Sequence, residues 1–63
     1  MRKKDFEKFI TNELLQDKDV KNVYVCEVKK DVVERNLCKQ QHENILYTWD
    51  FYKGNVIVNY CKK

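Results

Sequence analysis

Hydrophobic residues in the N-terminal segment lie on one side of a helix. They follow the spacing i, i+3, i+4, i+8 that lines up side chains along one helical face: Phe6, Phe9, Ile10 and Leu14. Charged residues fill most of the remaining positions, and Asp5 is a residue type that can cap a helix start. The pattern predicts an amphipathic helix from Lys3 to Gln16.

The C-terminal part of the chain alternates between the two faces of a strand in two runs, 45–52 and 56–61, on either side of Lys53-Gly54. Such runs around a glycine-containing turn are typical of a β-hairpin. A two-residue turn fixes the register, and one face then pairs Phe51 with Val56, Trp49 with Val58 and Tyr47 with Tyr60. The reverse face pairs Asp50 with Ile57, Thr48 with Asn59 and Leu46 with Cys61.

The middle of the chain is less regular. Residues 20–29 are rich in β-branched side chains and predict a strand, with Val23 and Val25 on one face and Tyr24 on the other. Segment 30–44 has two interpretations: a short second helix over 31–42 that Asp31 caps, or a strand from Val32 to Lys39.

Together these elements predict an α+β fold. We expect a small two-layer domain over residues 1–63, in which the N-terminal helix packs on a three-stranded, mostly antiparallel sheet that ends in the β-hairpin. A chain of 63 residues has room for one such domain.

Composition limits the function. The formal net charge is +3, which is mildly basic, and the three cysteines suit a reducing cytoplasm as free thiols. No apolar run is long enough to cross a membrane, and Asp5 interrupts the basic N-terminus before any signal-like segment. We therefore expect a cytoplasmic protein that does not bind membranes.

The sequence contains no recognisable catalytic or cofactor-binding motif. We expect no enzyme activity, no cofactor and no metal. The one alternative is a zinc site, because the chain has three thiols and an imidazole of zinc-ligand type: Cys26, Cys38, His42 and Cys61. Cys38 and His42 are four residues apart and would share a helix face, but the spacing matches no known zinc motif.

The aromatic face of the hairpin has two interpretations. Tyr47, Trp49, Phe51 and Tyr60 could stack nucleic-acid bases, or they could form the core beneath the N-terminal helix. The core interpretation is favoured because the helix needs an apolar partner surface, and it predicts that Trp49→Ala costs about 3–5 kcal/mol.

The reverse face of the sheet is the main functional lead. An apolar strip there would be exposed beneath a single covering helix and suits a protein partner or a homodimer. Its residues are Tyr24, Leu46, Tyr52 and Ile57. A second helix over 31–42 would instead cover this strip.

The favoured function is a small non-enzymatic protein-binding module that forms a homo-oligomer, with a dimer favoured. Its small size and its composition, which is rich in Lys and Asn and lacks Ala and Pro as expected from an AT-rich genome, resemble those of phage and mobile-element proteins that inhibit or regulate host proteins by surface contact. The alternative is a small nucleic-acid-binding domain that uses aromatic and basic residues. Its basic candidates are Lys29, Lys30, Arg35 and Lys39.

Overall fold

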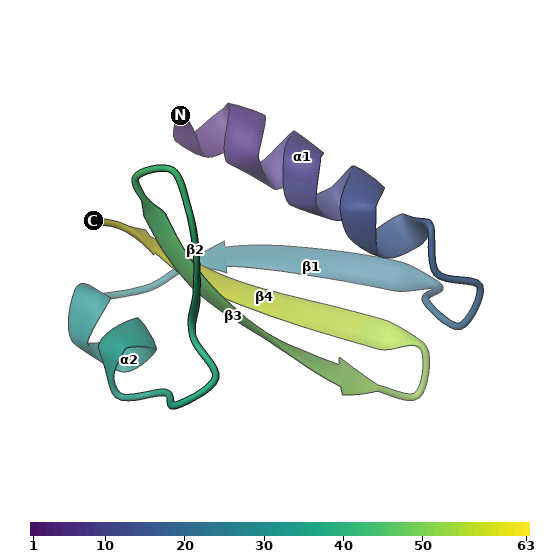
Figure 1. Ribbon diagram of the computed structural model, residues 1–63. Helices are drawn as coiled ribbons and strands as arrows, with labels where there is room; N and C mark the ends of the chain where they lie inside the picture. The colour runs from purple at the N-terminus through teal and green to yellow at the C-terminus, as the bar shows by residue number, and fades with distance from the viewer.

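A computed structural model describes residues 1–63, and Figure 1 shows its two helices and four strands. In chain order the elements are α1 (Lys3–Leu15), β1 (Asn22–Glu27), α2 (Lys30–Glu34), β2 (Gln40–His42), β3 (Ile45–Tyr52) and β4 (Asn55–Lys62). The fold is the α+β arrangement that the sequence predicts, with one additional short strand, β2, at the edge of the sheet.

Helix α1 forms where the apolar spacing predicts it. Phe6 and Ile10 are buried on its inner face, whereas Phe9 and Leu14 pack against the same core from its margin. The N-cap residue is Arg2, which makes no side-chain capping hydrogen bond, so Asp5 lies inside the first turn and is not the cap. An acidic side chain in the first turn still interacts favourably with the positive end of the helix dipole.

The four strands form one mixed sheet in the order β1-β4-β3-β2. Strands β3 and β4 form the antiparallel hairpin, and every cross-strand pair that the sequence predicts is present. The turn at Lys53 and Gly54 has positive φ angles of 48° and 84°, which are the backbone conformations of a type I′ turn. Glycine adopts this conformation without steric cost, whereas Lys53 does so against its preference.

The alternation of apolar and polar residues does not specify which strand β1 pairs with, or in which direction. β1 runs parallel to β4, with Val23 beside Val56 and Val25 beside Val58. Val23 and Val25 therefore face α1, as the strand pattern predicts, while Tyr24 lies on the other face. A side chain's face depends only on the period of two, which parallel and antiparallel strands share.

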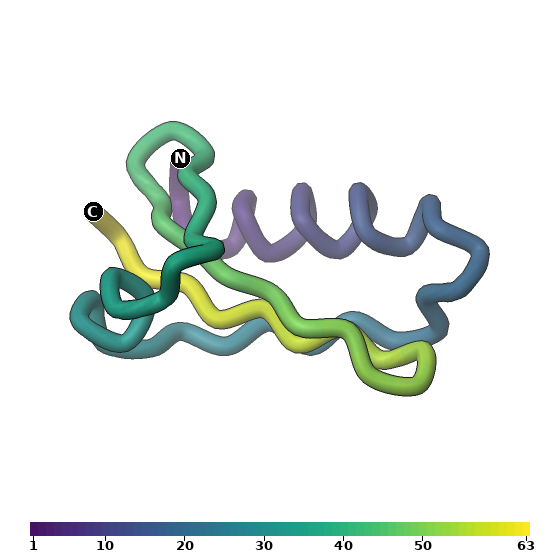
Figure 2. Tube along the Cα trace, turned by 60° about the horizontal axis from the view of Figure 1, so that its bottom comes forward, coloured from purple at the N-terminus to yellow at the C-terminus, as the bar shows by residue number.

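The main core lies between α1 and the sheet. Figure 2 shows α1 extending along one side of the strands. The buried residues of this core are Phe6, Ile10, Ile45, Tyr47, Val56, Val58 and Tyr60. Phe6 packs between two tyrosine rings, with its centroid 5.2 Å from those of both Tyr47 and Tyr60.

Segment 30–44 differs from both of its interpretations. The helix begins at Lys30 and ends at Glu34, so it covers only the beginning of 31–42, and Lys29 rather than Asp31 is its N-cap. Leu37, which would have shared a helix face with Val33, lies in the following loop and is 97% exposed. No strand forms over 32–39; instead Gln40–His42 pairs with the start of β3. Val33 is the residue that docks α2 on the sheet.

Candidate functional site

The sheet face opposite α1 is divided into a covered half and an open half. In the covered half, Val33 of α2 packs on Leu46 and Cys61, and Val28 contacts the same cluster. Leu46 is only 8% exposed, so it belongs to this small second core and not to a binding surface, contrary to its place in the predicted strip. The helix is too short to reach the other half of the face.

The open half contains the three other residues of the predicted strip. Tyr24 pairs with Ile57 across the parallel β1–β4 ladder, and Tyr52 is the diagonal neighbour of Ile57 on β3. Tyr24, Ile57 and Tyr52 are 54%, 44% and 66% exposed. We call these three residues the hairpin-end patch. They form an exposed apolar surface beside the turn that joins β3 to β4.

The patch adjoins an open strand edge. β1 pairs only with β4, and the backbone N–H groups of Asn22 and Val28 point toward β4, where they donate to Gly54 and Tyr60. Because donors alternate along a parallel ladder, the backbone groups of Val23 and Val25 point away from the sheet. An edge of this kind can accept a strand from another chain.

A second exposed aromatic pair lies on the opposite face of the hairpin. Trp49 and Phe51 are 43% and 49% exposed, so the prediction that the whole aromatic face forms the core is correct for Tyr47 and Tyr60 but wrong for these two. The reason is that β2 pairs only with residues 45–47 of β3 and leaves the rest of that strand as a sheet edge.

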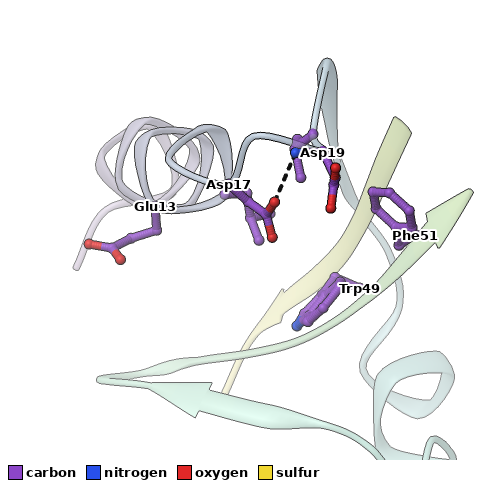
Figure 3. A pocket seen from close by; sticks show the side chains of 7 residues that line it. Glu13, Asp17, Asp19, Trp49 and Phe51 are labelled. Atoms are coloured by element: carbon purple, nitrogen blue, oxygen red, sulfur yellow. Dashed lines mark hydrogen bonds between the residues drawn. The ribbon is translucent and has the colours of Figure 1, made fainter. Parts of the chain in front are cut away.

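Trp49 and Phe51 form one wall of an open groove of about 490 Å³. Its other apolar residues are Leu14 and Val20. Figure 3 shows the carboxylates of Asp17 and Asp19, in the loop after α1, across from the two aromatic rings. Glu13 of α1 also lines the groove, but its carboxylate points away from the rings in this view. We call this the acidic groove. The sequence does not reveal it, because every residue of one wall is at least 29 positions from the residues of the other.

The four candidate zinc ligands are not brought together in the structure. Cys38 is exposed in the loop after α2, Cys26 is exposed on β1, and Cys61 is buried beneath α2. His42 lies on β2, where its ring stacks on Phe9 of α1 with centroids 4.2 Å apart. No cluster of three or more histidine, cysteine, aspartate or glutamate side chains is arranged to hold a metal ion. Cys38 and His42 do not share a helix face because α2 ends before either of them.

Burial changes the chemistry of one of these thiols. It raises the pKa of Cys61 above the ordinary value of 9.0, and the negative charge of Glu34 acts in the same direction. A raised pKa lowers the thiolate fraction at neutral pH and so lowers nucleophilicity. Cys61 therefore acts as a packing residue.

The basic residues named for nucleic-acid binding lie in and around α2. Lys30 forms an i, i+4 ion pair with Glu34 at 3.5 Å, and Arg35 forms one with Asp31 at 3.3 Å. The remaining two, Lys29 and Lys39, flank the helix on either side. Two of the positive charges thus have a carboxylate beside them, which weakens this patch as a track for phosphates.

Neither helix is long and apolar enough to span a membrane. Comparison of the chain with protein-family models, with curated proteins and with solved structures gives no significant match.

Proposed function

We propose that this protein is a non-enzymatic protein-binding module that acts by surface contact through the hairpin-end patch. The observation that supports this is the exposure of Tyr24, Tyr52 and Ile57 as neighbours on one face of the sheet, next to the unpaired edge of β1. Aromatic residues that are exposed together are typical of interface cores, because they bury large areas and lose little conformational entropy.

A homodimer is the first form of binding that we propose. The open edge of β1 in one copy would pair with that of a second copy, which would bring two hairpin-end patches onto one continuous sheet face. Inhibition or regulation of a host protein is the more specific role we propose for the same surface, in keeping with the small size of the chain.

The test is native mass spectrometry of the untagged protein over a range of concentrations, with two aspartate variants. Ile57→Asp places a charge in the patch, and Leu37→Asp places the same charge on the loop after α2, where Leu37 is 97% exposed. We expect a dimer for the wild type and for Leu37→Asp, and a monomer for Ile57→Asp.

A wild-type monomer at every concentration would contradict the dimer. The wider proposal then depends on photo-crosslinking in the native cells, with the crosslinker introduced at position 57 or at position 37. A partner captured at position 57 and not at 37 would support the patch, whereas equal capture at both positions would contradict it.

A further inference from the structure

We propose that the acidic groove binds an arginine side chain of a protein partner. This inference depends on the proposed function only in that the arginine belongs to a protein. The groove lies on the α1 face of the hairpin, whereas the hairpin-end patch lies on the other face. A partner that binds around the end of the hairpin, with contacts on both of its faces, would therefore contact both surfaces.

The charge of the groove is the first argument. Glu13, Asp17 and Asp19 line it, and no lysine, arginine or histidine does so, although the protein as a whole has a net charge of +3. None of the three carboxylates has an internal ion-pair partner. The ion pairs of the protein use other acidic residues: Glu27, Asp31, Glu34 and Glu43.

The negative potential of the groove also reaches the core beside it. Burial raises the pKa of Tyr47 above its ordinary value of 10.0, and the charge of Glu13 raises it further. One carboxylate is already held in place: the backbone N–H of Asp19 donates to Asp17 Oδ1 over 2.9 Å, which fixes the turn after α1. The acidic wall is thus partly preorganised for a cation.

The aromatic wall decides which cation fits. Trp49 and Phe51 present half-exposed rings to the same space as the carboxylates of Asp17 and Asp19 (Figure 3). A cation is attracted to the face of such a ring, most strongly to tryptophan. A guanidinium group is planar, so it can stack on a ring while its N–H groups donate to a carboxylate, which an ammonium group cannot do as well. A metal ion is a poorer occupant, because the acidic side chains are not clustered around one point.

Trp49 is the single tryptophan of the chain, so its fluorescence reports directly on the groove. The probe is an acetylated and amidated glycine–arginine–glycine peptide, titrated at low salt. Its counterpart with citrulline in place of arginine has nearly the same shape without the charge. We expect a saturable fluorescence change with the arginine peptide and about fivefold weaker binding of the citrulline peptide. High salt should weaken the binding of the arginine peptide alone, because only that peptide is charged.

Three variants locate the binding. Asp17→Asn and Asp19→Asn should each lower the affinity for the arginine peptide by about two- to fivefold, because each removes one exposed ion pair with the peptide. Asp50→Asn is the matched control: it removes the same charge from the same strand as Trp49, but from the opposite face. Its affinity should equal that of the wild type.

Equal binding of the citrulline peptide, or an equal loss in Asp50→Asn, would overturn the proposal. Equal binding of a lysine peptide would overturn the assignment to arginine, because a point charge would then suffice. These outcomes are independent of the dimer test, since Ile57→Asp does not change the acidic groove and neither Asp17→Asn nor Asp19→Asn changes the patch.

Discussion

The two halves of β3 have the same alternating pattern and opposite environments. Residues 45–48 are all buried, whereas residues 49–52 are all exposed. The first half has β2 beside it, α1 on one face and α2 on the other. The second half has β4 as its only strand neighbour, and neither helix covers it fully. Alternation therefore assigns a side chain to a face, but the neighbouring elements decide whether it is buried.

Because of this difference, one half of β3 contributes mainly to the stability of the fold and the other half is available to bind a partner. The buried half joins the two cores and accounts for much of the packing, whereas the exposed half displays aromatic side chains on both faces. Trp49 and Phe51 point to the acidic groove, and Tyr52 points to the hairpin-end patch. Substitutions in the two halves should therefore have very different consequences.

The largest expected effect is on the free energy of unfolding. Ile45 is fully buried, and Ile45→Ala should destabilise the protein by about 2–5 kcal/mol. Trp49→Ala removes a larger side chain that is 43% exposed, and we expect a loss of only about 1–2 kcal/mol. Urea unfolding followed by circular dichroism measures both. Equal losses would show that the exposed half is packed as tightly as the buried half.

The next effect tests whether α2 maintains the buried half. Val33 is fully buried on Leu46 and Cys61, whereas its neighbour Val32 is 51% exposed. Val33→Ala should cost about 2 kcal/mol, because it removes two buried methyl groups and leaves a small cavity. Val32→Ala should change stability by less than about 0.5 kcal/mol. The same urea experiment applies, and a harmless Val33→Ala would mean that α2 is not needed to cover this face.

A smaller effect appears at alkaline pH. The pKa of Tyr60 is raised above its ordinary value of 10.0 by burial, and Glu7 and Glu27 raise it further. The unfolded chain therefore releases this proton at a lower pH than the folded protein, so the stabilising contribution is complete below pH 10 and is lost as the pH rises through the folded pKa.

Tyr60→Phe keeps the ring and removes the ionisable hydroxyl. We expect its free energy of unfolding to fall less steeply than that of the wild type between about pH 9 and pH 11. Parallel pH dependences for the two proteins would show that Tyr60 ionises as readily when folded as when unfolded.

The mildest test changes no residue. Cys61 pairs with Leu46 in the buried half, whereas Cys26 and Cys38 are exposed. In native protein, iodoacetamide should modify Cys61 last, because the thiol is buried and its pKa is raised. Peptide mass spectrometry after timed quenching gives the order. Early modification of Cys61 would show that α2 opens frequently.

Much of the fold follows from local pattern. The spacing of Phe6, Ile10 and their neighbours predicts α1, and the turn at Gly54 sets the register of the hairpin correctly. The candidate surface was predicted only in part: Tyr24, Tyr52 and Ile57 are exposed as expected, but Leu46 is buried. The acidic groove was not predicted at all, because no local pattern relates Asp17 to Trp49.

The sequence by itself determined which residues form α1 and the hairpin, and which face of the sheet each side chain occupies. These properties depend on periods of 3.6 and 2 residues and on a glycine that tolerates positive φ, all of which are local. The tertiary structure alone decided that β1 pairs in parallel with β4, that α2 ends at Glu34, and that β2 stops beside Tyr47. Those choices depend on contacts between distant segments, and they determine which aromatic side chains remain free to bind a partner.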